Sequence, residues 1–352
     1  MNIAYFGDTN PGSTSRHRAD ALQRLGHAVR LLDTREAARG TFAPRWLHTL
    51  HTRTGYRLLQ PRMLRWLKSL NLRRENTDII WVNGGELLGP RCLRSLRELG
   101  RPVVLYNNDD PTGTRDGRAF DSLRQAIPHY DLCVVMREVN VPEYRALGAP
   151  KVLRVMMSYD EVVHAPVAAA EIPDKYRSEV CFIGACMPER GPLMVRLLEL
   201  GVPLSIWGDR WQRAPEWKLL EKAWRGPALK AREYALALAG SKVCLGLLSK
   251  GNRDLHTRRS VEIPYSGGLF CAERTVEHQQ LYREGLEAIF WADADECARQ
   301  CLALLAEPER REAIRQAGRR RILELKLGNE DVGRRIIAAA TGGLPPMAPP
   351  GE

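Results

Sequence analysis

The stretch from Asp254 to Phe270 reads DLHTRRSVEIPYSGGLF, and it contains the step on which the fold depends. Its middle has the character of a short helix, and the pair Gly267 and Gly268 then opens an apolar run. Glycine just past the last turn is a helix stop signal. A buried apolar run after such a stop indicates a strand of a parallel sheet. Helix followed by strand is the repeating step of an α/β fold.

The same alternation extends outward along the chain in two series. Short apolar runs bounded by Gly, Pro, Asn or Asp alternate with helix-like segments such as 18–25 and 91–99. Such runs are typical of buried strands, and their alternation with helices predicts parallel sheets with right-handed crossovers. The expected strands are 2–6, 28–32, 78–82, 102–106, 131–135 and 151–155 in the first series, and 180–183, 203–207, 242–248, 268–271 and 288–291 in the second.

Two series of this kind predict two Rossmann-like, doubly wound α/β domains that face a cleft. We expect the first domain at residues 1–165 and the second at 166–340, because the stretch 159–173 is small and proline-containing. The last residues, 341–352, are rich in Gly and Pro and are expected to be a disordered tail.

Composition excludes several classes of protein. Hydrophobic residues make up 44% and charged residues 27%, which is ordinary for a globular chain and excludes collagen, a coiled coil and wholesale disorder. No apolar run is long enough for a membrane span, and the N-terminus lacks a signal-peptide pattern, so we expect the cytoplasm. The eight cysteines form no CxxC pair and are expected to be small buried hydrophobes.

The chain is basic, with 53 Lys and Arg against 42 Asp and Glu, a net charge of +11. Such a surface favours anionic partners. The sequence shows no helix-turn-helix, zinc finger or aromatic RNP pattern, so no nucleic acid is expected.

Residues 37–74 contain nine Arg or Lys and no acidic residue. Within this segment Pro61 can open a helix, and Met63, Trp66, Leu67 and Leu70 share one of its faces. One interpretation is a helix packed on the domain with a basic outer face. The other is a basic amphipathic helix that contacts an anionic membrane, which makes 45–74 a candidate for peripheral membrane association.

Three loops that follow strands carry candidate binding residues. Gly12 and Ser13 open a helix whose N-terminus can hold an anion, and Arg190 can pair with a diphosphate in bidentate fashion. Glu262 can accept hydrogen bonds from a ribose diol, while Gly267 and Gly268 would let the backbone pass close to a nucleotide. An ordinary turn, a solvated arginine and a helix-surface carboxylate are the structural alternatives.

A resemblance follows from the stretch 259–296, which begins RSVEIPYSGGLF and continues with EHQQLYREGLEAIFWADADE. It resembles the C-terminal half of the spore-coat CgeB-like glycosyltransferases and, more broadly, of group 1 (family 4-like) glycosyltransferases of the GT-B fold. FIGACMPER, IWGDRW and SKVCLGLL occur in the order that the family shows, so that the likeness covers residues 178–325. The first half is similar more loosely, mainly through YNNDDP at 106–111.

The resemblance implies transfer of a sugar from a nucleoside-diphosphate-sugar to an unidentified acceptor (a glycan, a lipid-linked molecule or a protein) lying against the first domain. Glu262 matches the glutamate that holds the ribose, and Arg190 matches the basic residue that reaches the diphosphate. Asp254 stands where the family carries a second glutamate that contacts the sugar. Further donor-side candidates in the same cleft are Gly184, His256, Thr257 and Arg259.

No metal or other cofactor is expected, because arginine and a helix N-terminus can stabilise the charge that develops on a departing diphosphate. Asp293 and Asp295 are interpreted as a helix cap. The spacing of Asp254 and Glu262 hints, by resemblance, at a retaining enzyme. The candidates for acceptor contact or general base are His17, Asp109 and Asp110.

Two alternatives stay open. One is a sugar-nucleotide epimerase, which shares the two-domain plan. The other is a non-catalytic protein that binds anions or nucleic acid, since fold alone does not grant activity. Trp207 and Trp211 could stack on a nucleobase, but packing in the core is the more common role of a tryptophan.

Overall fold

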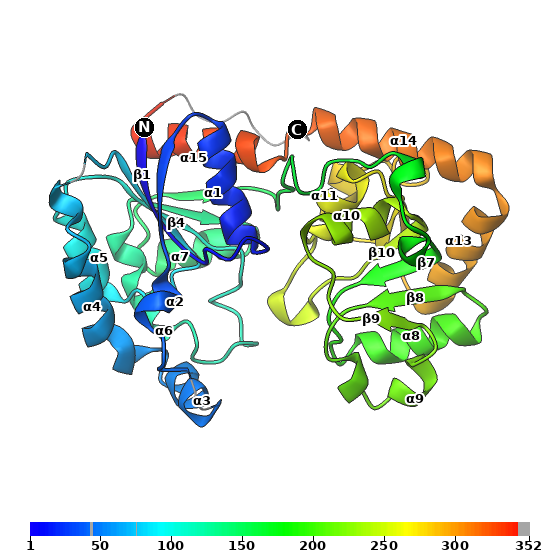
Figure 1. Ribbon diagram of the computed structural model, residues 1–352, viewed down its shortest axis with the longest axis horizontal. Helices are drawn as coiled ribbons and strands as arrows, with labels where there is room; N and C mark the ends of the chain where they lie inside the picture. The colour runs from blue at the N-terminus through cyan, green and yellow to red at the C-terminus, as the bar shows by residue number, and fades with distance from the viewer. Residues whose placement is uncertain (43–44, 75, 344–352) are drawn as a thin grey trace. The chain divides into compact units, whose positions relative to one another are not determined.

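The computed structural model describes residues 1–42, 45–74 and 76–343, which form two compact units. Unit 1 contains Met1–Met156, Lys250–Asp254 and, of the described C-terminal residues, 329–343. Unit 2 contains Met157–Ser249 and Leu255–Gly328. Each unit is a six-stranded parallel sheet covered by helices, so the predicted pair of Rossmann-like α/β domains is confirmed (Figure 1).

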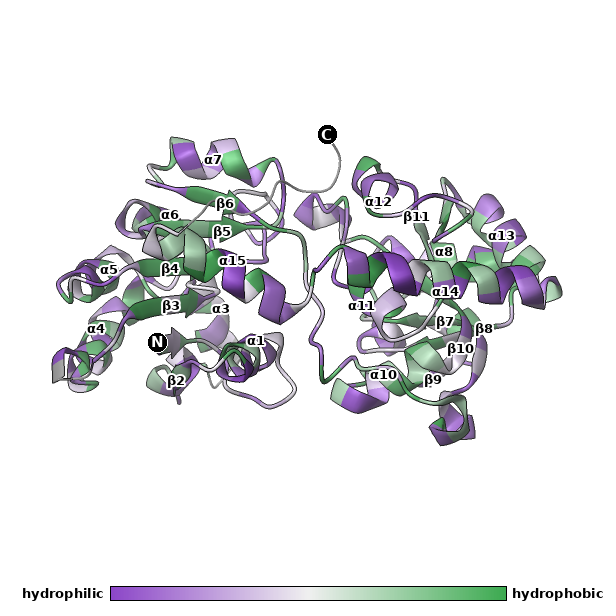
Figure 2. Ribbon diagram, turned by 90° about the horizontal axis from the view of Figure 1, so that it is seen from above, coloured by the Kyte–Doolittle hydropathy of each residue, from purple (hydrophilic) through white to green (hydrophobic). Residues whose placement is uncertain are grey.

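The sheet of unit 1 has the order β2-β1-β3-β4-β5-β6. Strand β1 pairs in parallel with the edge strand β2 on one side and with β3 on the other. Side chains of successive strand residues alternate between the two faces, and both faces of the inner strands are covered, so β4 and β5 are apolar throughout and appear largely green in Figure 2. The strands are β1 (Asn2–Phe6), β2 (Ala28–Leu32), β3 (Ile79–Asn83), β4 (Val103–Tyr106), β5 (Leu132–Val135) and β6 (Val152–Arg154).

Helices cover both faces of this sheet. On one face α4, α5 and α6 pack through buried side chains such as Met63, Leu93 and Leu123. On the other face α1 packs against the C-terminal helix α15 (Figure 1). The helices of unit 1 are α1 (Thr14–Arg24), α2 (Thr34–Ala37), α3 (Arg45–Arg53), α4 (Gln60–Ser69), α5 (Pro90–Arg97), α6 (Asp121–Ala126), α7 (Asn140–Ala146) and α15 (Asn329–Thr341).

The sheet of unit 2 has the order β12-β11-β10-β7-β8-β9. Its strands are β7 (Ser178–Ile183), β8 (Leu204–Trp207), β9 (Trp224–Gly226), β10 (Ser241–Gly246), β11 (Phe270–Glu273) and β12 (Ile289–Trp291). Its helices are α8 (Arg190–Glu199), α9 (Trp217–Leu220), α10 (Ala231–Ala239), α11 (Arg259–Tyr265), α12 (Val276–Leu281), α13 (Ala294–Ala306) and α14 (Pro308–Glu324).

Each predicted strand is present, with bounds within two residues of those expected. The predicted domain bounds need correction. The chain leaves unit 1 at Met156 instead of 165, and α15 belongs to unit 1 instead of the second domain, because its apolar face packs on α1. Of the expected tail, residues 344–352 lie outside the described part of the chain, and Thr341 is the last residue of α15.

The apolar face of the basic segment is used for packing. Met63 and Leu67 on α4 are buried in the core of unit 1, and Trp66 and Leu70 pack against it. For α4 the first of the two interpretations therefore holds. No helix within the described residues is long and apolar enough to cross a bilayer.

Tryptophans and cysteines fill the cores. Trp207 and Trp211 are 3% and 1% exposed, so packing is confirmed as their role. All eight cysteines are free thiols, and all but the half-buried Cys186 are buried.

Candidate functional site

Two guanidinium groups lie at the carboxyl end of β7 in unit 2. Arg190 is the first residue of α8, and its Nη1 and Nη2 donate to the carbonyls of Ala185 and Leu248 at 2.8 and 2.9 Å. Arg259 is the first residue of α11, and its Nε donates to the Ile183 carbonyl at 2.7 Å. The centres of the two guanidinium groups lie 5.3 and 5.7 Å from the ring of Phe182, the residue before Ile183. The structure thus brings together two cations that the sequence places 69 positions apart.

Neither of these two arginines forms an ion pair with a described residue. Among the described residues, no carboxylate lies within 4.0 Å of Arg190 or Arg259, although Arg190 is only 4% exposed. Burial, and then the charge of Arg259, lower the pKa of Arg190 to about 10. An anion stabilises two cations that lie close together in a partly buried environment. Guanidinium groups match the geometry of phosphate oxygens, which makes a phosphate a suitable anion.

Close approach of two loops fixes the backbone beside these arginines. Gly208 has a φ of 149°, and a Cβ there would lie 2.0 Å from the carbonyl oxygen of Gly184. That same carbonyl accepts a hydrogen bond of 2.8 Å from the indole Nε1 of Trp211. A Cβ on Gly184 would lie 2.8 Å from Nη2 of Arg259. Glycine is therefore required at both positions, and Gly184 lies directly against one of the two cations.

Glu262 of α11 is a buried carboxylate, 6% exposed. The hydroxyl of Tyr234 donates to its Oε2 at 2.9 Å, and Nε2 of His164 lies 3.8 Å from its Oε1. Burial acts to raise the pKa of Glu262, but His164, Arg258 and Arg259 outweigh it, and the pKa lies below its ordinary value. The group is therefore a charged acceptor at neutral pH. His164 and Tyr234 position it and were missed, because neither lies near Glu262 in the sequence.

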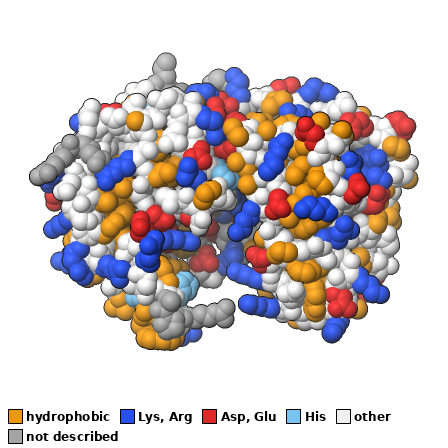
Figure 3. All heavy atoms as spheres, in the orientation of Figure 1, with side chains coloured by type: hydrophobic (Ala, Val, Ile, Leu, Met, Phe, Trp, Pro, Cys, Tyr) orange, Lys and Arg blue, Asp and Glu red, His pale blue; other side chains and the backbone are white. Residues whose placement is uncertain are grey.

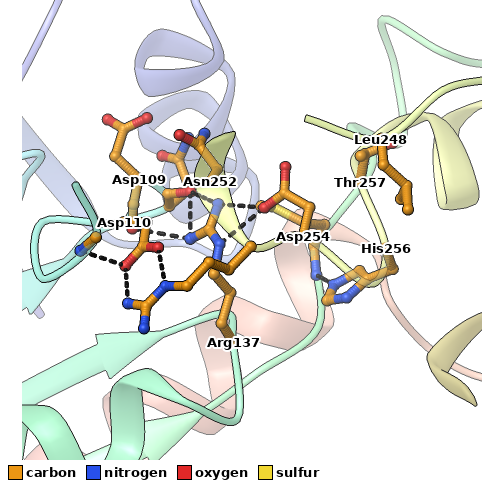
Figure 4. A network of polar contacts seen from close by, with 12 residues as sticks. Asp109, Asp110, Arg137, Leu248, Asn252, Asp254, His256 and Thr257 are labelled. Carbon is orange, nitrogen blue, oxygen red and sulfur yellow. Dashed lines mark hydrogen bonds and ion pairs between the residues drawn. The ribbon is translucent and has the colours of Figure 1, made fainter. Parts of the chain in front are cut away.

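Asp254 is engaged by a different partner from the one expected. Its Oδ1 accepts from Nε of Arg137 at 2.7 Å, and both side chains are buried, at 6% and 5% exposure (Figure 4). Nη1 of Arg137 also donates to the carbonyls of Asn108 and Asp109, at 3.1 and 2.8 Å. This arrangement ties the segment Lys250–Asp254 to unit 1, and it gives Asp254 a structural partner in place of a sugar hydroxyl.

His256 and Thr257 follow Asp254 but differ in exposure. His256 is 2% exposed, its Nε2 accepts from the amide of Met157 at 3.0 Å, and its Nδ1 is hydrogen-bonded to the carboxylate of Glu277. Thr257 is half-buried, and its amide donates to Ser260 Oγ at 3.0 Å. His256 therefore holds the chain in place, whereas the hydroxyl of Thr257 stays available.

Gly267 and Gly268 lie at the opposite edge of the sheet from the arginines. They follow α11 and precede β11, which places them at the amino end of that strand. Gly267 has a φ of 87° and ends the helix, and a Cβ on Gly268 would lie 3.0 Å from Cys244 Sγ. The expectation that they approach the nucleotide is therefore corrected: they serve as a helix stop and as close packing, because a crossover helix separates the two edges.

Asp110 is held by an ion-pair network within unit 1. Its two carboxylate oxygens accept from Nε and Nη2 of Arg253 at 2.6 and 2.7 Å, and Nδ2 of Asn140 donates at 2.8 Å (Figure 4). Arg253 also donates to Glu143 at 2.8 Å. Burial acts to raise the pKa of Asp110, but Arg253 and Asn140 hold it below its ordinary value. Asp110 is thus a fixed anion, which fits a structural role better than that of a general base.

His17, Gly12 and Ser13 form the turn into α1. Ser13 caps the helix by accepting from the amide of Arg16 at 3.1 Å. His17 is 6% exposed, and its Nε2 lies 3.2 Å from the carbonyl of Pro11. Gly12 is exposed. The structure gives Ser13 and His17 roles in holding this turn.

Asp109, an acceptor-side candidate, lines a cavity in unit 1 that measures about 810 Å³. Glu86 lines the same cavity and was not predicted. Asn107 connects the two loops, because its Nδ2 donates to the Gly84 carbonyl at 2.9 Å and its Oδ1 accepts from the Asp109 amide at 2.7 Å. Partial burial raises the pKa of Glu86 above its ordinary value, and the charge of Asp109 adds to the effect.

Residues 190–327 match a family model described as glycosyl transferase-like. The match contains Arg190, Arg259 and Glu262 and confirms the resemblance. The matched segment is less than half of the chain, and it is similar to the glycosyl transferase-like family. No curated protein sequence matches the chain.

Solved structures share the two-domain fold of this chain over nearly its whole length. Sucrose-phosphate synthase from Thermosynechococcus elongatus has a TM-score of 0.70 at 14% identity, covering 96% of this chain and 100% of that one. Anabaena HepE in complex with UDP-glucose has a TM-score of 0.66 at 12% identity, covering 97% and 100%. A putative UDP-N-acetylglucosamine 2-epimerase from Listeria monocytogenes has a TM-score of 0.59 at 11% identity, covering 96% and 95%.

Proposed function

We propose that the protein transfers a sugar from a nucleoside-diphosphate-sugar to an acceptor hydroxyl, and that unit 2 binds the nucleotide. One observation carries the proposal: Arg190 and Arg259 lie together at the carboxyl end of β7 with no ion-pair partner among the described residues, inside the segment that matches the family model. Glu262 is a charged acceptor on the same helix as Arg259, suited to a ribose diol. In open parallel sheets, ligands bind at the carboxyl ends of the strands.

A uridine nucleotide is the donor that the comparisons favour. The structure of HepE was determined with UDP-glucose bound, and the fold is shared over nearly the whole of both chains. The residues of this chain supply the parts that any nucleoside diphosphate needs: cations for the diphosphate and a carboxylate for the pentose.

The reaction forms a bond between the acceptor oxygen and the anomeric carbon, and it breaks the bond from that carbon to the β-phosphate oxygen. The electron pair leaves with the nucleoside diphosphate, and the acceptor proton passes to a base. Arg190 and Arg259 would stabilise the charge that grows on the leaving diphosphate. In this proposal the two arginines stabilise the leaving diphosphate without a metal ion. The resemblance favours retention of configuration at the anomeric carbon.

The test is calorimetry of UDP binding to the full chain. Arg259→Ala and Arg190→Lys should each weaken binding about 10- to 100-fold, because each removes charged hydrogen bonds of about 1.5–3 kcal/mol. Arg196→Ala is the control, since Arg196 lies on the same helix as Arg190 but pairs with Asp295 on the surface. Wild-type affinity in both variants, or no UDP binding at all, would contradict the proposal.

Glu262 has its own readout in the same experiment. Wild type should prefer UDP over 2′-deoxy-UDP, because a charged carboxylate accepts hydrogen bonds from the ribose hydroxyls. Glu262→Gln should lose most of that preference while still binding the diphosphate. A preference that survives the substitution would remove Glu262 from the ribose site.

The epimerase alternative is supported only by the weaker fold match to the Listeria protein. Incubating UDP-N-acetylglucosamine with the enzyme and no acceptor distinguishes the two, because an epimerase converts the sugar by itself. A new sugar isomer in the NMR spectrum would favour the epimerase.

The nucleic-acid alternative requires a continuous basic surface. On the face shown in Figure 3, basic side chains are interspersed with acidic and hydrophobic ones over both units. Salt-dependent binding to random DNA without UDP binding would favour this alternative.

We also propose that α3, rather than α4, makes the membrane contact suggested by the basic segment. Trp46 and Leu50 lie one turn apart on α3 and are 66% and 40% exposed, and the nearby Leu58 is 58% exposed. Arg53 and Arg57 lie in the same stretch. Exposed apolar side chains flanked by cations fit an anionic lipid surface.

A further inference from the structure

The cavity of about 810 Å³ in unit 1 lies where an α/β sheet binds ligands. Glu86 follows β3 and Asp109 follows β4, so both carboxylates lie at the carboxyl edge of the sheet. The remaining walls come from α3, from Tyr56 in the turn after it and from residues 115–120. The volume is in the range of about 300–1,000 Å³ that is usual for small-molecule sites.

The carboxylate wall is built with precision. Gly84 and Gly85 have φ values of 91° and 87°, and a Cβ on Gly85 would lie 2.9 Å from Leu105 Cδ1. The chain after β3 can therefore turn sharply only with glycine, and this turn presents Glu86 to the cavity. The buried Asn107 fixes this loop relative to the loop of Asp109. Carboxylates held in this way are suited to accept hydrogen bonds from hydroxyl groups.

Rings form a second wall. His48, Tyr56 and Phe120 all line the cavity, and they come from α3, the turn after it and the segment before α6. Aromatic faces next to carboxylates offer both the apolar and the polar contacts that a sugar ring or similar polyol needs.

Three guanidinium groups also line the cavity. Arg53 is exposed and has no ion-pair or hydrogen-bond partner in the described part of the chain. Arg118 is 61% exposed and bonds Asp121 at 2.9 Å, whereas Arg115 lies 3.9 Å from Asp116. Arg53 is therefore the cation that a ligand can engage at least cost, and Arg118 is sufficiently exposed to join it.

We propose that this cavity binds the acceptor and that the acceptor is a phosphorylated polyol. Glu86 and Asp109 accept hydrogen bonds from its hydroxyls, and Arg53 and Arg118 hold its phosphate. This inference rests on the proposed function and adds the chemical class of the acceptor.

The cavity contains both carboxylates and guanidinium groups, and this mixture favours a phosphorylated polyol over other acceptors. A neutral glycan would leave Arg53 without a partner. A ligand that is anionic throughout would be repelled by the two carboxylates. A molecule with hydroxyls at one end and a phosphate at the other can bind the carboxylates through its hydroxyls and the arginines through its phosphate.

The first arm of the test is calorimetry of the full chain with hexose phosphates. Glucose 6-phosphate and fructose 6-phosphate are compared with glucose, which has the ring but no phosphate. At least one phosphorylated sugar should bind ten-fold or more tightly than glucose, and Arg53→Ala and Arg118→Ala should each weaken it about ten-fold. Arg65→Ala is the control, since it removes one exposed cation from α4, outside the cavity.

The second arm distinguishes a lipid source of the same chemistry. Vesicles containing phosphatidylinositol replace the soluble sugars, and vesicles with the same amount of phosphatidylserine control for the general attraction of α3 to anionic lipid. If Arg53→Ala loses retention on the first vesicles but not on the second, the phosphate belongs to a lipid headgroup. If neither arm shows binding that depends on Arg53 and on the phosphate, the inference is wrong. UDP affinity should be unchanged in all three variants, so a wild type that fails to bind UDP would refute the proposed function instead.

Discussion

At the residue scale, the arginines and carboxylates divide into two kinds. Arg190 and Arg259 have no carboxylate partner among the described residues, whereas Arg137 and Arg253 are fully paired. Unpaired buried charge is costly unless a ligand compensates it, so the unpaired group marks the candidate binding site. The paired groups instead stabilise the fold.

Removing one partner from the buried pair of Arg137 with Asp254 should strongly destabilise unit 1. Arg137→Ala leaves a buried carboxylate without its cation, which costs about 3–5 kcal/mol. Urea unfolding should show the loss, with Arg145→Ala on α7 as an exposed control. A change below 1 kcal/mol would mean that Asp254 is not held by Arg137 in solution.

Glu86 makes a prediction about pH. Its pKa is raised by partial burial and by Asp109, so the folded protein keeps the proton to a higher pH than the unfolded chain does. Stability therefore falls as pH rises from the ordinary glutamate pKa through the raised one. Glu86→Gln should match the wild type in unfolding free energy at low pH and exceed it at neutral pH. Equal free energies at both pH values would contradict the raised pKa.

Site residues could be proposed from the sequence where the pattern was local. Arg190 and Glu262 lie in short motifs next to strands, and the structure places both in unit 2 on α8 and α11. Asp110 and Asp254 were proposed as acceptor-contact and sugar-contact residues, whereas the structure pairs them with arginines. These arginines lie 143 and 117 positions away in the sequence. Ion pairs between residues so far apart in the sequence cannot be predicted from the spacing of residues within a motif.

At the element scale, the contact between the loops after β7 and β8 positions the arginines. Gly208→Ala would place a Cβ 2.0 Å from the Gly184 carbonyl oxygen and push the loop out of place. We expect UDP affinity to fall at least ten-fold. Gly226→Ala is a matched control, because Gly226 has a similar φ of 154° but its Cβ would meet nothing nearer than 3.8 Å. Equal UDP affinity in the two variants would show that the loop contact does not matter.

Helix α3 makes the second prediction at this scale. Trp46→Ala with Leu50→Ala should abolish flotation with anionic vesicles at low salt, because it removes the exposed apolar face. Leu286→Ala in unit 2 is the control, since that side chain is 59% exposed but lies outside the basic segment. Flotation of the double variant at the wild-type level would exclude α3.

Strands were predictable because a strand buried on both faces needs an uninterrupted apolar run. The run Trp224–Gly226 was missed because β9 is an edge strand of three residues containing an exposed arginine. Helix α15 was missed because its apolar stripe packs on α1, more than 300 positions earlier in the chain.

At the scale of the whole molecule, the division into two sheets followed from the sequence, but the path of the chain did not. Segment Lys250–Asp254 and helix α15 both return to unit 1 after the chain has entered unit 2. Their attachment depends on ion pairs such as Arg253 with Asp110, which only the folded structure brings together.

The central claim is that unit 2 holds a nucleoside diphosphate between two arginines and a glutamate. A crystal structure of the full chain with UDP tests it most directly. The account predicts diphosphate oxygens within hydrogen-bond distance of Arg190 and Arg259, and the ribose hydroxyls on Glu262. UDP bound elsewhere, with these three side chains free of it, would contradict the account.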